Sequence, residues 1–60
     1  MSRNREELNK TIEAKRMDLE ECEQELNSRY YPSIVRMAMM YYIEVLQQQL
    51  DRHQDELINL

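Results

Sequence analysis

The chain has 60 residues, no glycine, one proline, one cysteine and a formal net charge of −4 at pH 7. This length allows one small domain at most, and a lone cysteine excludes an internal disulfide. The negative charge argues against a nucleic-acid-binding protein, because such proteins gather lysines and arginines on one surface.

The composition favours helices over the whole chain. Glu, Gln, Leu, Arg and Met are good helix formers, and the tight turns of a β-sheet are hard to make without glycine. We therefore expect an all-α fold in a single domain spanning residues 1–60. The first helix should cover about residues 4–28, a turn about 29–32, and the second helix about 32–58.

The first helix is predicted to begin at Asn4, which precedes Glu7 in the spacing of a capping box; Ser2 is the other candidate cap. After the cap, apolar residues recur at intervals of three, four or seven, the spacing of a heptad seam. Lys15 occupies the one polar position of this seam. Its apolar members are Leu8, Ile12, Leu19, Cys22 and Leu26.

A break follows at Pro32, which has no amide hydrogen and disfavours helical geometry at Tyr31. Proline is well suited to the first position of a following helix. The break contains no glycine, so one long kinked helix is the alternative to an antiparallel hairpin.

The second helix carries a matching seam of residues that alternate at intervals of three and four. Folding the chain about Tyr31 places Leu19 opposite Ile43 and Ile12 opposite Leu50. Because the seams match in this register, we favour the hairpin. Gln47 to Gln49 lie between seam residues and are expected to face solvent. The second seam consists of Ile43, Leu46, Leu50, His53, Leu57 and Leu60.

The most unusual stretch is residues 37–43, where seven consecutive apolar residues leave the helix without a polar face. So short a chain has little other material to cover them, and we expect them to be buried against another chain. Methionine adapts to irregular surfaces, and tyrosine is enriched at interfaces. This predicted interface, the Met/Tyr belt, consists of Met37, Met39, Met40, Tyr41, Tyr42 and Ile43.

Two occupants of the Met/Tyr belt are compatible with the sequence. The preferred one is a second copy of the chain, so that two hairpins form a homodimeric four-helix bundle. The alternative is a helix of another protein docked in a groove.

Carboxylates are concentrated in the second half of the first helix. Helical geometry spreads them around its outer face, so we interpret them mainly as solvated residues. Electrostatic docking of a basic partner is the alternative, and it would act on the association rate more than on affinity. This candidate acidic face consists of Asp18, Glu20, Glu21, Glu23 and Glu25.

The sequence offers little for catalysis. Di-iron helical bundles place a glutamate three residues before a histidine, but Leu50 occupies that position relative to His53. Acidic neighbours should raise the pKa of Cys22, which disfavours a reactive thiolate. We therefore expect no catalytic residue, no cofactor and no metal ligand.

Membrane insertion and secretion are not expected either. The apolar segment 34–46 is shorter than the roughly 20 residues that span a bilayer, and it lacks a basic polar face. Residues 2–7 are polar and do not resemble a signal peptide. With the free thiol of Cys22, these features predict a soluble, cytoplasmic protein.

One motif resembles a known family. Gln47-Gln48-Gln49-Leu50-Asp51 is similar to the Ser-Gln-x-Leu-Asp motif on the second helix of small bacterial helical hairpins that dephosphorylate sporulation response regulators. Gln47 replaces the serine, and the two helical segments are further apart than in that family. Ile12, Arg16 and Leu19 fall at spacings similar to its first helix. The resemblance implies that Asp51 and the neighbouring glutamines would act on a phosphorylated receiver domain.

The sequence as a whole predicts a non-enzymatic interaction or regulatory module that acts through the Met/Tyr belt and homodimerises. Two alternatives stay open. One is a phosphatase-like regulator of a response regulator, and the other is an obligate subunit of a larger hetero-oligomeric helical assembly.

Overall fold

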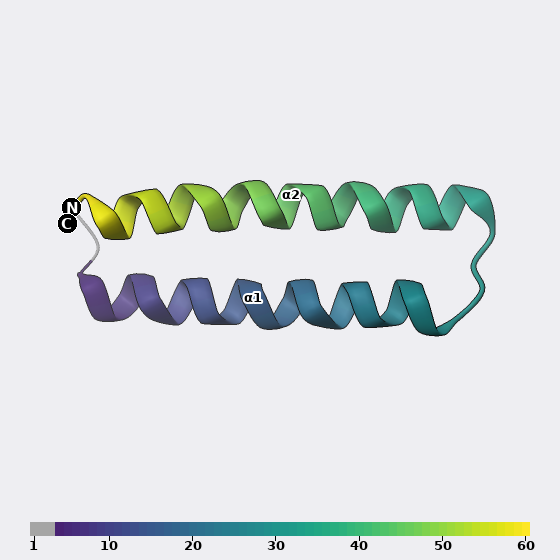
Figure 1. Cartoon of the computed structure of the whole chain (residues 1–60), viewed down its shortest axis with the longest axis horizontal. Coiled ribbons are helices and arrows are strands. Elements are labelled where there is room, and N and C mark those ends of the chain that lie inside the picture. The colour runs from purple at the N-terminus through teal and green to yellow at the C-terminus, as the bar shows by residue number, and fades with distance from the viewer. Residues whose placement is uncertain (1–3) are drawn as a thin grey trace.

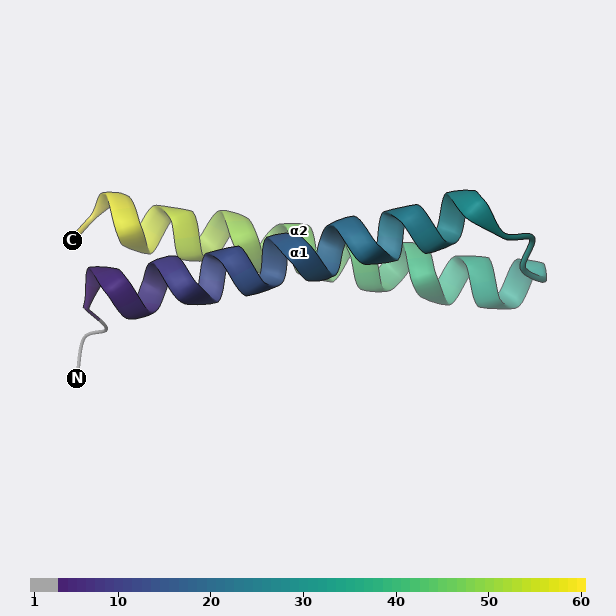
Figure 2. The ribbon, with the colours of Figure 1, turned by 90° about the horizontal axis from the view of Figure 1, so that it is seen from below.

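The computed structural model describes residues 4–60, which form two helices, α1 (Arg5–Ser28) and α2 (Ser33–Ile58). The helices lie side by side and antiparallel, joined at one end by a short loop (Figure 1). A view turned by 90° shows that they cross at a shallow angle (Figure 2). The all-α hairpin is confirmed, and the kinked-rod alternative is wrong.

Helix α1 begins directly after Asn4, which is extended (φ −78°, ψ 165°) and whose Oδ1 accepts a hydrogen bond of 2.8 Å from the backbone N–H of Glu7. This bond satisfies one of the amide groups that have no partner within the first turn. Glu6 and Glu7 also place negative charge where the helix dipole favours it. The other candidate cap, Ser2, lies outside the described residues.

The loop between the helices is built without glycine. Pro32 has φ −57° and ψ 153°, and its carbonyl accepts 3.0 Å hydrogen bonds from the N–H groups of Val35 and Arg36. Pro32 therefore caps α2, and the helix begins one residue later than expected, at Ser33. No residue in the described range 4–60 has a positive φ. Glycine is consequently not required for this turn.

The core is a single layer of apolar side chains between the helices. Four apolar side chains in residues 4–60 are buried: Leu8, Ile12, Leu46 and Leu50. Leu19 and Leu57 are half-buried against the cluster of Leu8, Ile12 and Leu50. Most other members of the predicted seams are also half-buried: Lys15, Cys22, Leu26, Ile43 and His53. The prediction is wrong for Leu60, which is 53% exposed at the end of the chain. A layer this thin removes little apolar surface from water, as is typical of very short chains.

Two polar contacts cross between the helices beside this core. Lys15 Nζ donates a 2.8 Å hydrogen bond to Gln49 Oε1, and the Tyr42 hydroxyl donates one of 2.7 Å to Asp18 Oδ2. Gln49 is half-buried. The expectation that all three glutamines face solvent is therefore wrong for Gln49, which pairs with the polar residue of the opposite seam.

Neither described helix combines the length and the apolar character needed to cross a bilayer.

Candidate interaction surface

The Met/Tyr belt wraps around α2, so the hairpin covers only part of it. Met39 and Ile43 are half-buried on the side that faces α1. The other four members remain between 45% and 68% exposed: Met37, Met40, Tyr41 and Tyr42.

Apolar side chains of α2 also form a second stripe, which we call the outer stripe; four of its five members are exposed, and Val45 is half-buried. Its members recur at intervals of three or four, as on one face of a helix. They lie on the side opposite the inner seam of Ile43, Leu46 and Leu50, and they are Ile34, Met37, Ala38, Tyr41 and Val45. Ile34, at its loop end, is 75% exposed. Ile34, Ala38 and Val45 are not among the predicted interface residues. The sequence did carry a signal for them, because Ile34 lies seven residues before Tyr41 and Ala38 lies seven residues before Val45.

A groove of about 500 Å³ lies between the helices near the loop. Its apolar lining comes from Leu26 of α1 and from Met40 and Ile43 of α2. Carboxylate and amide side chains of both helices complete the lining: Glu23, Asn27, Glu44 and Gln47. We call this site the interhelical groove. Belt residues therefore contribute to two separate surfaces, the outer stripe and the interhelical groove.

The predicted acidic face is divided by the structure. Glu20, Glu21 and Glu23 are exposed, whereas Asp18 and Glu25 are half-buried. Asp18 accepts the hydrogen bond from the hydroxyl of Tyr42 that is described above. Glu25 accepts a hydrogen bond from the hydroxyl of Tyr31 and forms an ion pair of 3.4 Å with Arg29. Two of the five carboxylates therefore stabilise the hairpin and its loop.

These hydrogen bonds change the chemistry of the two tyrosines. A carboxylate that accepts a hydrogen bond from a phenol favours the neutral phenol, so the pKa of Tyr42 is raised, mainly by its hydrogen bond to Asp18. The pKa of Tyr31 is raised in the same way, mainly by its hydrogen bond to Glu25.

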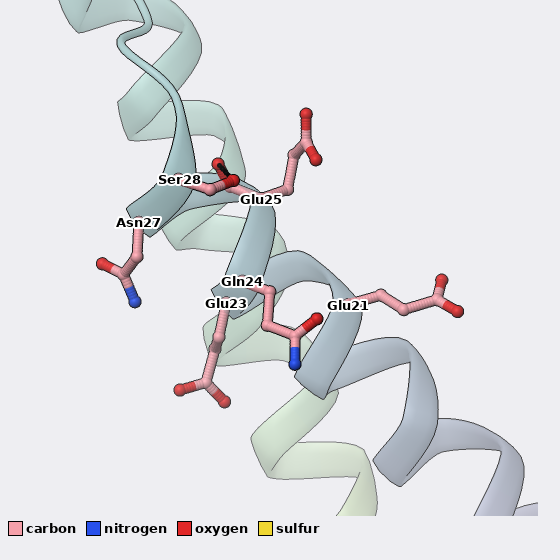
Figure 3. Close-up of a pocket in the computed structure, with 6 residues that line it drawn as sticks. All are labelled: Glu21, Glu23, Gln24, Glu25, Asn27 and Ser28. Carbon is pink, nitrogen blue, oxygen red and sulfur yellow. Dashed lines mark hydrogen bonds between the residues drawn. The ribbon is translucent and has the colours of Figure 1, made fainter.

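The acidic residues near the loop surround an open hollow on α1 (Figure 3). The side chains of Glu21 and Glu23 point in different directions there and do not converge (Figure 3). Within residues 4–60, no three His, Cys, Asp or Glu side chains are grouped so that they could hold a metal ion.

The thiol and the imidazole lie on the sides of α1 and α2 that face each other. Cys22 is half-buried, and its pKa is raised by burial and by the nearby carboxylates of Asp18 and Glu21. Such a thiol is a poor nucleophile at neutral pH. His53 is half-buried, and its Nδ1 lies 3.6 Å from Glu56 Oε1.

The segment that resembles the phosphatase motif presents two kinds of side chain. Gln47, Gln48 and Asp51 are exposed, whereas Gln49 and Leu50 are turned toward α1. The motif therefore has both an anchored side and a free polar side. On α1, Arg16 is exposed, Ile12 is buried and Leu19 is half-buried.

No protein-family model matches the chain, and no curated protein or solved structure matches it significantly.

Proposed function

We propose that the protein is a small helical-hairpin module that binds proteins through its exposed apolar surface and associates with a second copy of itself. The observation that carries the proposal is the exposure of Met37, Met40, Tyr41 and Tyr42 on a chain with a thin core. Soluble monomers rarely expose a continuous apolar patch unless it serves an interaction. Large aromatic and methionine side chains are also typical of the centres of interfaces.

The outer stripe supports a second copy as the first partner. It presents the small Ala38 beside the large Tyr41, so an antiparallel pair of α2 helices would seat the tyrosine of each copy against the alanine of the other. Such a contact is isologous and closes on itself. Because it buries surface on both copies at once, it adds the stability that a short chain lacks.

This geometry refines the expected four-helix bundle. The outer side of α1 is polar, and its one large apolar residue among the exposed side chains is Met17, at 55% exposure. Helices of a square bundle need apolar surface toward two neighbours each. We therefore place the two α2 helices at the centre of a flatter assembly, with one α1 helix on each flank.

The test compares two exposed tyrosines. Tyr41 belongs to the outer stripe, whereas Tyr30 lies in the loop and is 91% exposed. Tyr41→Ala should lower the molar mass in light scattering to that of one chain, and Tyr30→Ala should leave a dimer. Circular dichroism must show that both variants stay helical. A native protein that is monomeric at every concentration tested would refute self-association, and material that is soluble only with another chain would favour the hetero-oligomeric alternative.

A second candidate function rests on the exposure of Gln47, Gln48 and Asp51 on one turn of α2. Hydrolysis of an aspartyl phosphate requires a water molecule in line with the bond to be broken; water adds to phosphorus, and the carboxylate of the aspartate departs. An exposed amide can orient that water, and a carboxylate nearby can accept its proton. The motif resemblance points to the same three residues.

This candidate is tested directly on a phosphorylated receiver domain. If it is right, the protein accelerates release of phosphate, and Gln48→Ala or Asp51→Ala removes most of the acceleration. Gln24→Ala, which changes an exposed glutamine of α1, serves as the matched control. A panel of phosphorylated receivers whose lifetimes do not change would eliminate this function and leave the binding module.

A further inference from the structure

The interhelical groove differs in chemistry from the outer stripe. The stripe is apolar along its length, whereas the groove places Leu26, Met40 and Ile43 between the carboxylates of Glu23 and Glu44. Within residues 4–60, neither of these carboxylates forms an ion pair. No residue that lines the groove is basic. The groove is therefore an apolar site with an uncompensated negative rim.

We infer that the interhelical groove binds an amphipathic helix of another protein whose apolar side chains are flanked by arginine or lysine. Leucine-type side chains would contact Leu26, Met40 and Ile43, since a methionine-lined surface adapts to apolar side chains of several shapes. Arginine can lay its aliphatic stem along the apolar lining and direct its guanidinium to a carboxylate at the rim.

The charge of the groove selects this occupant. A second copy of the chain is itself acidic, with a net charge of −4, and would bring like charge to Glu23 and Glu44. An uncharged apolar helix would leave the rim without a partner. Charge complementarity of the inferred kind also suppresses wrong partners and accelerates encounter.

The inference rests on the proposed function in that it names a partner for a protein-binding module, but it uses another surface. Helical geometry places Met40 about 100° away from Tyr41 around α2, so the groove is not the centre of the outer stripe. A dimer formed through the outer stripe can therefore leave the groove accessible. If the groove does not bind a partner helix, self-association through the outer stripe can still hold, and the reverse is also true.

The probe is a blocked synthetic helix with leucines at heptad spacing, flanked by arginines. Two control peptides replace every arginine by glutamate or every leucine by serine. The methyl resonances of Met40 and Ile43 report on the groove, and those of Met37 report on the outer stripe. We expect the arginine peptide to shift the groove methyls and both control peptides to leave them unchanged.

Two double variants with equal net charge separate local from long-range electrostatics. Glu23→Gln with Glu44→Gln removes the rim, while Glu13→Gln with Asp55→Asn removes two exposed carboxylates elsewhere. The rim variant should bind the arginine peptide at least about tenfold more weakly, and the control variant should lose little affinity. Circular dichroism must show that both remain helical.

Three outcomes would overturn the inference. Equal weakening in both double variants means that net charge alone attracts the peptide, and shifts confined to Met37 mean that it binds the outer stripe. Groove methyls that shift with protein concentration in the absence of peptide mean that a second copy fills the groove. Repeating the titration in Tyr41→Ala keeps the result independent of self-association through the outer stripe.

Discussion

Lys15 and Gln49 are joined across the hairpin by a hydrogen bond of 2.8 Å between Nζ and Oε1, although 34 positions separate them in the chain. Both side chains are half-buried beside the apolar seam. A slip of one helix along the other would break this bond and leave both groups without partners. Polar residues within a seam specify the register of paired helices for this reason.

Removing one partner of this bond should cost more than removing both. Lys15→Met leaves the Gln49 amide half-buried and unpaired, and we expect a loss of about 1–2 kcal/mol in the free energy of unfolding. Lys15→Met combined with Gln49→Leu should recover most of that loss. Urea unfolding measures the two single variants, Lys15→Met and Gln49→Leu, and the double variant. A double variant as unstable as the sum of its single changes would show that the pair contributes no coupling.

Leu8 is the most completely buried side chain of the core. Leu8→Ala should lower the free energy of unfolding by about 2–5 kcal/mol, which is enough to unfold much of so small a protein. Ile58→Ala is the control, because Ile58 is one of the most exposed apolar residues. Thermal melts followed by circular dichroism compare them. Equal effects would mean that the core does not lie where the structure places it.

The tyrosine–carboxylate hydrogen bonds predict instability at alkaline pH. The pKa values of Tyr42 and Tyr31 are raised in the folded state. Their contribution to stability is therefore complete below the unfolded pKa of about 10 and is lost as pH rises through the folded pKa. We expect the melting temperature to fall in that range. Tyr42→Phe and Tyr31→Phe should each reduce the pH dependence, and an unchanged pH profile in both would contradict this assignment.

The thiol of Cys22 should react slowly. Burial and the carboxylates of Asp18 and Glu21 raise its pKa, so little thiolate is present at neutral pH. We expect alkylation by iodoacetamide to be slower than for a free cysteine and to accelerate only at alkaline pH. Asp18→Asn should increase the rate at neutral pH. Glu56→Gln, at a carboxylate that does not contribute to this shift, should have no effect.

Self-association should make stability depend on concentration. A second copy that binds the folded hairpin through the outer stripe raises the melting temperature by mass action. Melts over a hundredfold range of concentration, about 1–100 μM, should therefore rise in midpoint for the native chain. Tyr41→Ala should melt at one temperature throughout. A constant midpoint in the native chain, with the mass of a single chain throughout, would contradict self-association.

The sequence by itself determined the local structure of this protein. The spacing of Leu8 and Ile12 in α1, and of Leu46 and Leu50 in α2, reveals which side of each helix is apolar. The polar side chain of Asn4 marks where the first helix begins. The ring of Pro32 marks where regular helical geometry is interrupted. Each of these signals depends on neighbours within one or two helical turns, so it can be detected without knowing the rest of the fold.

The tertiary structure decided how each exposed or polar side chain is used. The segment 37–43 is apolar in every direction, so its own residues do not show which side packs. The seam that continues through Leu46 placed Ile43 toward α1, but only the structure shows that Tyr41 is left exposed. The partnership of Lys15 with Gln49, and of Asp18 with Tyr42, depends on the register and crossing of two helices. These contacts join residues far apart in the chain, and a pattern that repeats every few residues carries no information about which of them meet.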